Sequence, residues 1–110
     1  MAFDEQLAER VRAILGRRVD LDERRMFGGI AFLIGGNMCC GVNAEDLIVR
    51  LEPDRAAELL SSEPETRPMD ITGRPMRGWL FVAPDATAED ADLERWVRRA
   101  EAFASELPPK

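Results

Sequence analysis

The residues with the greatest capacity for covalent chemistry are two adjacent cysteines, Cys39 and Cys40. A thiolate can act as a nucleophile, a metal ligand or a redox centre. Successive residues of a strand point to opposite faces, so a disulfide between these two would need a strained turn. Two cysteines in a chain without histidine are also too few for a zinc site. We interpret both as small apolar residues of a core, with a redox sensor as the alternative.

Other groups that could support catalysis are scarce. The chain has no histidine and no tyrosine, and Ser61, Ser62 and Ser105 lie in acid-rich segments without a partner base. The acid pairs Glu45-Asp46 and Glu89-Asp90 fall at an expected turn and helix start, where capping explains them. The glycines do not have the spacing of a phosphate-binding loop. We therefore predict that the protein is not an enzyme and uses no catalytic residue, metal or cofactor.

One segment has the composition of a binding surface. The loop from Arg74 to Trp79 contains Arg74, Met76, Arg77 and Trp79, and these residue types are enriched at the centres of protein interfaces. We predict that these four side chains form an exposed anchor for a protein partner. The alternative is a turn whose Trp79 enters the core and whose arginines pair with the abundant acids.

The composition of the whole chain limits its function further. Its 110 residues fit one domain, residues 1–110, and 45% apolar with 33% charged residues is typical of a folded globular protein. The formal net charge of −6 argues against direct nucleic-acid binding, because neutralising phosphates requires a basic surface. The chain contains no apolar run of membrane-spanning length, and its acidic N-terminal segment is unlike a signal peptide. We expect a cytoplasmic protein that contacts neither nucleic acid nor membrane.

Three segments have the apolar periodicity of amphipathic helices. The first lies at the N-terminus and is followed by a polar connector over residues 19–25. The second is short, begins at Pro53 and ends at Pro64. The third follows a capping box of Thr87 and Asp90. Its expected packing residues are Leu93, Trp96, Val97, Ala100, Phe103 and Leu107.

Five segments between the helices are predicted strands. Residues 26–42 form two strands joined by a two-residue turn at Gly35-Gly36, and both faces of the first strand are apolar. That strand should be central and covered on both sides. The pair Gly28-Gly29 indicates a bulge or a close backbone approach. Three further strands are expected over residues 47–51, 67–72 and 79–83.

The resulting order, α-β-β-β-α-β-β-α, predicts the fold class. It is typical of a two-layer α+β sandwich, here with a five-stranded antiparallel sheet. An edge strand of such a sheet invites dimerisation, either through strand pairing or through helix packing.

The chain resembles the amino-terminal domain of the TfoX/Sxy family from about residue 10 to residue 107. The match begins at Met26, Phe27, Gly28 and Gly29 with the strand that follows, and it includes Arg67, Pro68 and Met69. Further matching elements, in the same order and spacing, are Gly36-Asn37-Met38, Asp46-Leu47, Gly78-Trp79, Pro84 and Leu93-Glu94-Arg95-Trp96.

The resemblance implies a domain of the secretion-chaperone-like type. Named members of this family regulate natural competence together with a cyclic-AMP-responsive transcription factor, and they carry a second, helical domain. This sequence ends at Lys110, where that domain would begin, so the resemblance is to a stand-alone copy of the first domain. The resemblance implies no catalytic residues for this chain.

Residues and resemblance together predict a non-enzymatic regulatory or adaptor domain that acts through protein–protein interaction. We expect it to form a homodimer and to be linked to competence or transcriptional regulation. The motif residues, Met26 to Gly29 and Arg67 to Met69, are interpreted as mainly structural. The alternative is a small-molecule-binding or minor enzymatic domain with a pocket near Met26–Gly29.

Overall fold

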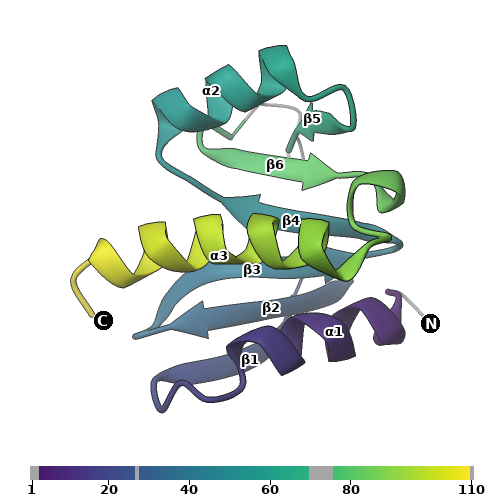
Figure 1. Ribbon diagram of the computed structural model, residues 1–110. Helices are drawn as coiled ribbons and strands as arrows, with labels where there is room; N and C mark the ends of the chain where they lie inside the picture. The colour runs from purple at the N-terminus through teal and green to yellow at the C-terminus, as the bar shows by residue number, and fades with distance from the viewer. Residues whose placement is uncertain (1–2, 27, 70–75, 110) are drawn as a thin grey trace.

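A computed structural model describes residues 3–26, 28–69 and 76–109 of the chain. Over these residues the chain forms three α-helices, a short 3-10 helix and six strands (Figure 1). The helices are α1 (Glu5–Leu15), α2 (Pro53–Ser62) and α3 (Asp90–Glu106), with the 3-10 helix η1 at Pro84–Ala86. The strands are β1 (Leu21–Met26), β2 (Gly29–Ile34), β3 (Asn37–Asn43), β4 (Asp46–Arg50), β5 (Thr66–Pro68) and β6 (Trp79–Val82).

The strands form one antiparallel sheet in the order β1-β2-β3-β4-β6-β5. All three helices lie on the same side of this sheet: α1 beside β1 and β2, α3 across β3 and β4, and α2 beside β5 and β6 (Figure 1). The predicted two-layer α+β arrangement is therefore confirmed. The predicted number of strands is wrong, because the sheet has six strands and not five.

The additional strand is β1, which occupies most of the segment expected to be a polar connector. It pairs with β2 from Leu21 opposite Ile34 to Met26 opposite Gly29. One of its charged side chains, Glu23, pairs with helix α1. Arg12 of α1 donates two hydrogen bonds to the carboxylate of Glu23, at 2.6 and 2.8 Å. Backbone pairing and this ion pair allow a polar segment to form an edge strand.

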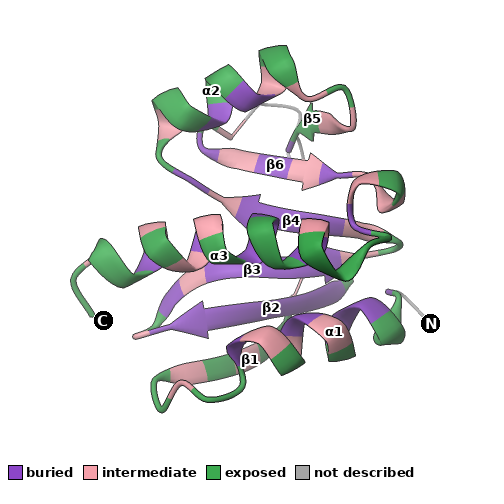
Figure 2. Ribbon diagram, in the orientation of Figure 1, coloured by how far each residue is buried: buried purple, intermediate pink, exposed green. Residues whose placement is uncertain are grey.

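The core lies between the sheet and the helices, and strands β2, β3 and β4 are the most completely buried (Figure 2). Every residue of β2 is buried, as its two apolar faces predicted. However, the helices cover only one face of it. On the other face the methyl group of Met38 lies over Gly41, 3.3 Å from the position a Cβ would take. The largest side chains of the core with less than 2% exposure include Phe32, Leu15, Leu47, Leu80 and Leu93.

A β-bulge changes the interpretation of the two cysteines. Phe32 pairs with Cys40 and Leu33 pairs with Met38, so Cys39 is the extra residue between them. Both cysteines are fully buried in the same helix-side core, and both are free thiols. The expectation that they point to opposite faces is wrong, because strict alternation fails at a bulge.

The glycine predictions are confirmed. Gly35 and Gly36 have φ values of +58° and +84° and form the two-residue turn between β2 and β3. A Cβ on Gly29 would lie 2.1 Å from the carbonyl oxygen of Val42. Gly29 is therefore a place where two backbones approach too closely for any side chain.

The observed helix ends agree less well with the predictions made from the sequence. Asp4 caps α1 by accepting hydrogen bonds from the N–H groups of Gln6 and Leu7. The predicted capping box at α3 is wrong, since the N-cap is Glu89 and its side chain makes no capping bond. The Thr87 hydroxyl instead donates to the carbonyl of Pro84 in the preceding 3-10 turn. Among the described residues, no helix combines the length and the apolarity needed to cross a bilayer.

Candidate interaction surface

The predicted anchor loop leads directly into β6. Met76 and Trp79 are half-buried and Arg77 is exposed, while Arg74 lies outside the described residues. The turn is held by backbone hydrogen bonds, from the Trp79 N–H to the Met76 carbonyl at 3.1 Å and from the Leu51 N–H to the Gly78 carbonyl at 2.7 Å. Gly78 has a φ of +89°, which only glycine adopts without strain. The local backbone therefore presents Met76, Arg77 and Trp79 at fixed positions.

These three residues share a small cavity with α2. The cavity has a volume of about 120 Å³, and we call it the docking pocket. Ligand sites for small molecules usually enclose roughly 300–1,000 Å³, so this pocket has the size for one apolar side chain. It is lined by Pro53, Ala56, Ala57, Leu60, Pro68, Met76, Arg77, Gly78, Trp79 and Leu80.

Two arginines lie near the docking pocket, Arg77 in its lining and Arg50 against Trp79. The guanidinium of Arg50 lies 5.3 Å from the centre of the Trp79 ring and 5.7 Å from that of Phe103. Arg77 lies 3.6 Å from Asp54, and the two side chains are 78% and 85% exposed. An ion pair this exposed is weak, so Arg77 is free to bind another carboxylate. Trp79 stays at the surface and does not enter the core.

The second predicted motif, Arg67 to Met69, has a divided role. Arg67 pairs with Asp46 at 2.7 Å, and its guanidinium lies 4.7 Å from the centre of the Phe81 ring. Pro68 lines the docking pocket. Met69 is fully buried. The motif therefore supports the sheet and one wall of the pocket.

The first motif lies at the opposite edge of the sheet. Met26, Gly28 and Gly29 line an open hollow of about 280 Å³ together with Phe3 and Arg25. Phe27 lies outside the described residues. Arg25 already stacks over the Phe3 ring at 5.3 Å. This hollow is where the predicted small-molecule pocket would lie, and among the described residues that line it Arg25 alone is titratable.

The described residues provide little for covalent or metal chemistry. A hydrogen bond with Cys39 and complete burial both raise the pKa of the Cys40 thiol well above its usual value. A thiol in this state is a poor nucleophile. Over residues 3–26, 28–69 and 76–109, acids and cysteines do not gather in a group of three that could hold a metal ion.

Sequence reasoning missed a third cavity, which lies between α1 and α3. It has a volume of about 490 Å³, and we call it the helix slot. The sequence shows charged residues three or four apart on α3, at Asp90, Glu94, Arg98 and Glu101, but nothing local pairs them with α1. Its lining residues are Arg10, Ala13, Ile14, Leu15, Arg17, Arg18, Asp90, Leu93, Glu94, Arg98 and Glu101.

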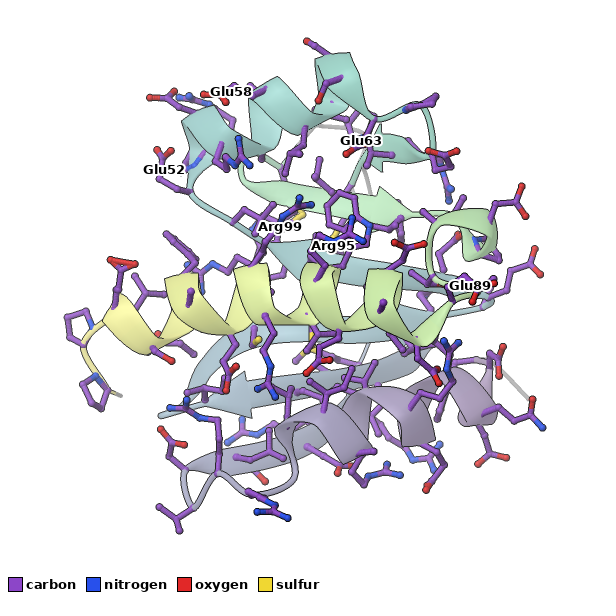
Figure 3. The ribbon with its side chains drawn as sticks, in the orientation of Figure 1. Glu52, Glu58, Glu63, Glu89, Arg95 and Arg99 are labelled. Atoms are coloured by element: carbon purple, nitrogen blue, oxygen red, sulfur yellow. The ribbon has the colours of Figure 1, made fainter. Side chains whose placement is uncertain are left out.

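The other side of α3 faces α2 and carries Arg95 and Arg99 (Figure 3). The Arg99 guanidinium stacks over the Trp96 ring at 4.8 Å, which leaves Trp96 only 5% exposed. Burial and the charges of Arg55 and Arg95 lower the pKa of Arg99, and Glu63 partly offsets this. Arg99 therefore acts mainly as a cover for the core.

Comparison with known proteins identifies the family. Neither a curated protein nor a solved structure shows a significant match to the chain. The secretion-chaperone-like fold therefore remains a prediction from the resemblance. The family profile of the TfoX N-terminal domain matches residues 13–104, which include the docking pocket and both glycine motifs. The chain belongs to the TfoX N-terminal domain family.

Proposed function

We propose that the protein is a non-enzymatic adaptor or regulatory domain that binds a protein partner at the docking pocket. Membership of the TfoX family supports a role in competence or transcriptional regulation in the cytoplasm. The net charge of −6 supports a protein partner over direct contact with nucleic acid.

One observation carries the proposal: apolar side chains with interface chemistry stay half-exposed around a preformed cavity of about 120 Å³. Interface hot spots typically consist of an anchor side chain that fills such a pocket beside tryptophan and arginine. Arg77 lines the pocket, and Arg50 stacks on Trp79, another residue of its lining. The partner segment that fits best has one aliphatic or aromatic anchor followed closely by an acidic residue.

The rival function is small-molecule binding in the hollow beside Met26 and Gly29. A thermal-shift screen against cell metabolites separates the two, because a ligand raises the melting temperature according to its occupancy. We expect no metabolite to raise it. A reproducible shift that is lost on substituting Arg25 would favour the rival.

Photo-cross-linking in cells tests the docking pocket directly. A photoreactive amino acid replaces Arg77, whose exposed side chain lies at the pocket mouth. The matched control carries the same amino acid at Arg24, which is similarly exposed at the opposite edge of the sheet. We expect a discrete protein adduct from position 77 that is absent from position 24. Equal adduct patterns, or none from position 77, would contradict the proposal.

A further inference from the structure

We infer that the helix slot is a self-association surface, on which a second copy of this chain docks about a two-fold axis parallel to α1 and α3. In this arrangement α1 of one copy lies over α3 of the other. The inference does not depend on the docking pocket, which lies beside α2 and stays open in the dimer.

The slot is a defined groove with an apolar floor and closed ends. Leu15 and Leu93 form part of its floor and are almost fully buried. An ion pair with α3 closes each end, made by α1 at one end and by the turn after α1 at the other. Arg10 binds Asp90 at 3.0 Å, and Arg18 binds Glu101 at 3.2 Å. These two pairs also show that the helices run in the same direction across the slot, as Figure 1 shows.

The two walls of the slot have opposite charge. Three arginines and no acid line the α1 wall, namely Arg10, Arg17 and Arg18. Three acids and one arginine line the α3 wall, namely Asp90, Glu94, Glu101 and Arg98. Within the described part of the chain Arg17 has no carboxylate partner. The basic wall therefore has capacity for a further acid.

A two-fold axis along the slot makes these walls complementary. Because α1 and α3 are parallel, the rotation places the basic wall of each copy over the acidic wall of the other. The same favourable contact is then made twice, as an isologous interface requires. The ion pairs at the ends become four-charge clusters around the axis, and the apolar floors face each other.

Over the described residues, both edge strands have features that disfavour strand pairing. Strand β5 has three residues and ends at Pro68, which cannot donate a backbone hydrogen bond. Strand β1 carries four consecutive charged residues, from Asp22 to Arg25. Short, proline-containing or charged edges are features that prevent strand pairing. Of the two predicted modes of dimerisation, strand pairing and helix packing, these edges therefore favour helix packing.

The charges of the lining favour a protein surface over a small molecule as the occupant of the slot. Four arginines and three acids make up seven of the eleven lining residues. The volume of about 490 Å³ lies within the roughly 300–1,000 Å³ of small-molecule sites, so it is the charge pattern that favours a protein. A surface with many charges of both signs is better matched by another protein surface with the opposite pattern.

Charge reversal tests the two-fold arrangement by sedimentation velocity, over a concentration series from about 1 µM to 1 mM. Arg17→Glu makes the basic wall less basic, and Glu94→Arg makes the acidic wall less acidic. Each variant alone should dimerise at least about tenfold more weakly than the wild type. Mixed in equal amounts, the two variants should partly recover dimerisation, because the mixed dimer keeps one unaltered basic wall over one unaltered acidic wall.

Ala13→Trp fills the slot without changing its charge and should also abolish dimerisation. Arg24→Glu, on β1, is the charge-matched control and should have no effect. Circular dichroism melting checks that every variant folds. A wild type that is monomeric throughout the series, a dimer unaffected by Arg17→Glu and Glu94→Arg, or single variants that stay monomeric when mixed would each overturn the inference.

Discussion

The centre of the sheet and the docking pocket are both apolar, but they differ in how they are covered. Phe32, at the centre, lies under α1 and α3 and is completely inaccessible. Met76 and Trp79 lie beside α2 and remain half-exposed. The same class of residue is therefore structural in one region and available for recognition in the other. Helix cover decides between these roles, and hydrophobicity alone does not.

The largest contrast should appear in thiol reactivity. Cys39 and Cys40 are buried in the covered region, so a thiol reagent reaches them only after the protein opens. We expect both to react with Ellman's reagent about a thousandfold more slowly in native protein than in denaturant. In Met76→Cys the new thiol should react rapidly without denaturant. Fast labelling of Cys39 or Cys40 in native wild type would revive the redox-sensor alternative.

Truncation of a side chain in each region should separate their contributions to stability. Phe32→Ala removes a fully buried aromatic and should lower the free energy of unfolding by about 4 kcal/mol. Met76→Ala removes a half-exposed side chain and should lower it by less than about 1 kcal/mol. Urea denaturation measures both values. Similar losses for the two variants would mean that the docking pocket is part of the core.

Gly29→Ala tests how tightly the covered region is packed. Its methyl group would meet the Val42 carbonyl oxygen at 2.1 Å, so we expect a loss of about 3 kcal/mol in the free energy of unfolding. Gly28→Ala is the matched control, because its Cβ meets nothing within 4 Å and only its φ of +72° opposes the change. That variant should lose about 1 kcal/mol. Thermal melting should rank the two in this order, and the reverse order would contradict the close approach.

The smallest effect concerns the ion pair that holds β1 against α1. Hydrogen bonds from Arg12 lower the pKa of Glu23 from its usual 4.5. The lowered pKa means that the pair stabilises the fold above about pH 4.5 and loses this contribution as the pH falls through the folded-state value. Glu23→Gln should therefore cost about 0.5–1 kcal/mol at neutral pH, and progressively less as the pH falls below about 4.5. A loss that does not change with pH would contradict this assignment.

The sequence was sufficient to predict the elements whose burial follows a simple period. The predicted third strand has Leu47 and Val49 in the core, and the helix beginning at Pro53 forms as expected. Strand β1 could not be predicted, because its partners are the backbone of β2 and the distant Arg12. The bulge at Cys39 also escaped prediction, since an inserted residue breaks the period of two without changing composition.

The candidate site was predicted only in part. Met76, Arg77 and Trp79 have residue types that indicate an interface, and the structure places them at one cavity. The other wall of the docking pocket comes from α2, and the sequence predicted only that α2 is an amphipathic helix. The helix slot joins segments about 80 residues apart, and only the tertiary fold brings Arg10 to Asp90. Contacts of that kind leave no local signal.

The most direct test of the central claim is the adduct yield of the position-77 cross-linking probe in protein that also carries Met76→Asp. This change places a charge in the apolar docking pocket. Because Met76 is only half-buried, its replacement should leave the fold intact. We predict that the adduct disappears while the melting temperature stays within a few degrees of that of the parent protein. An undiminished adduct in the folded variant would show that recognition does not occur at the docking pocket.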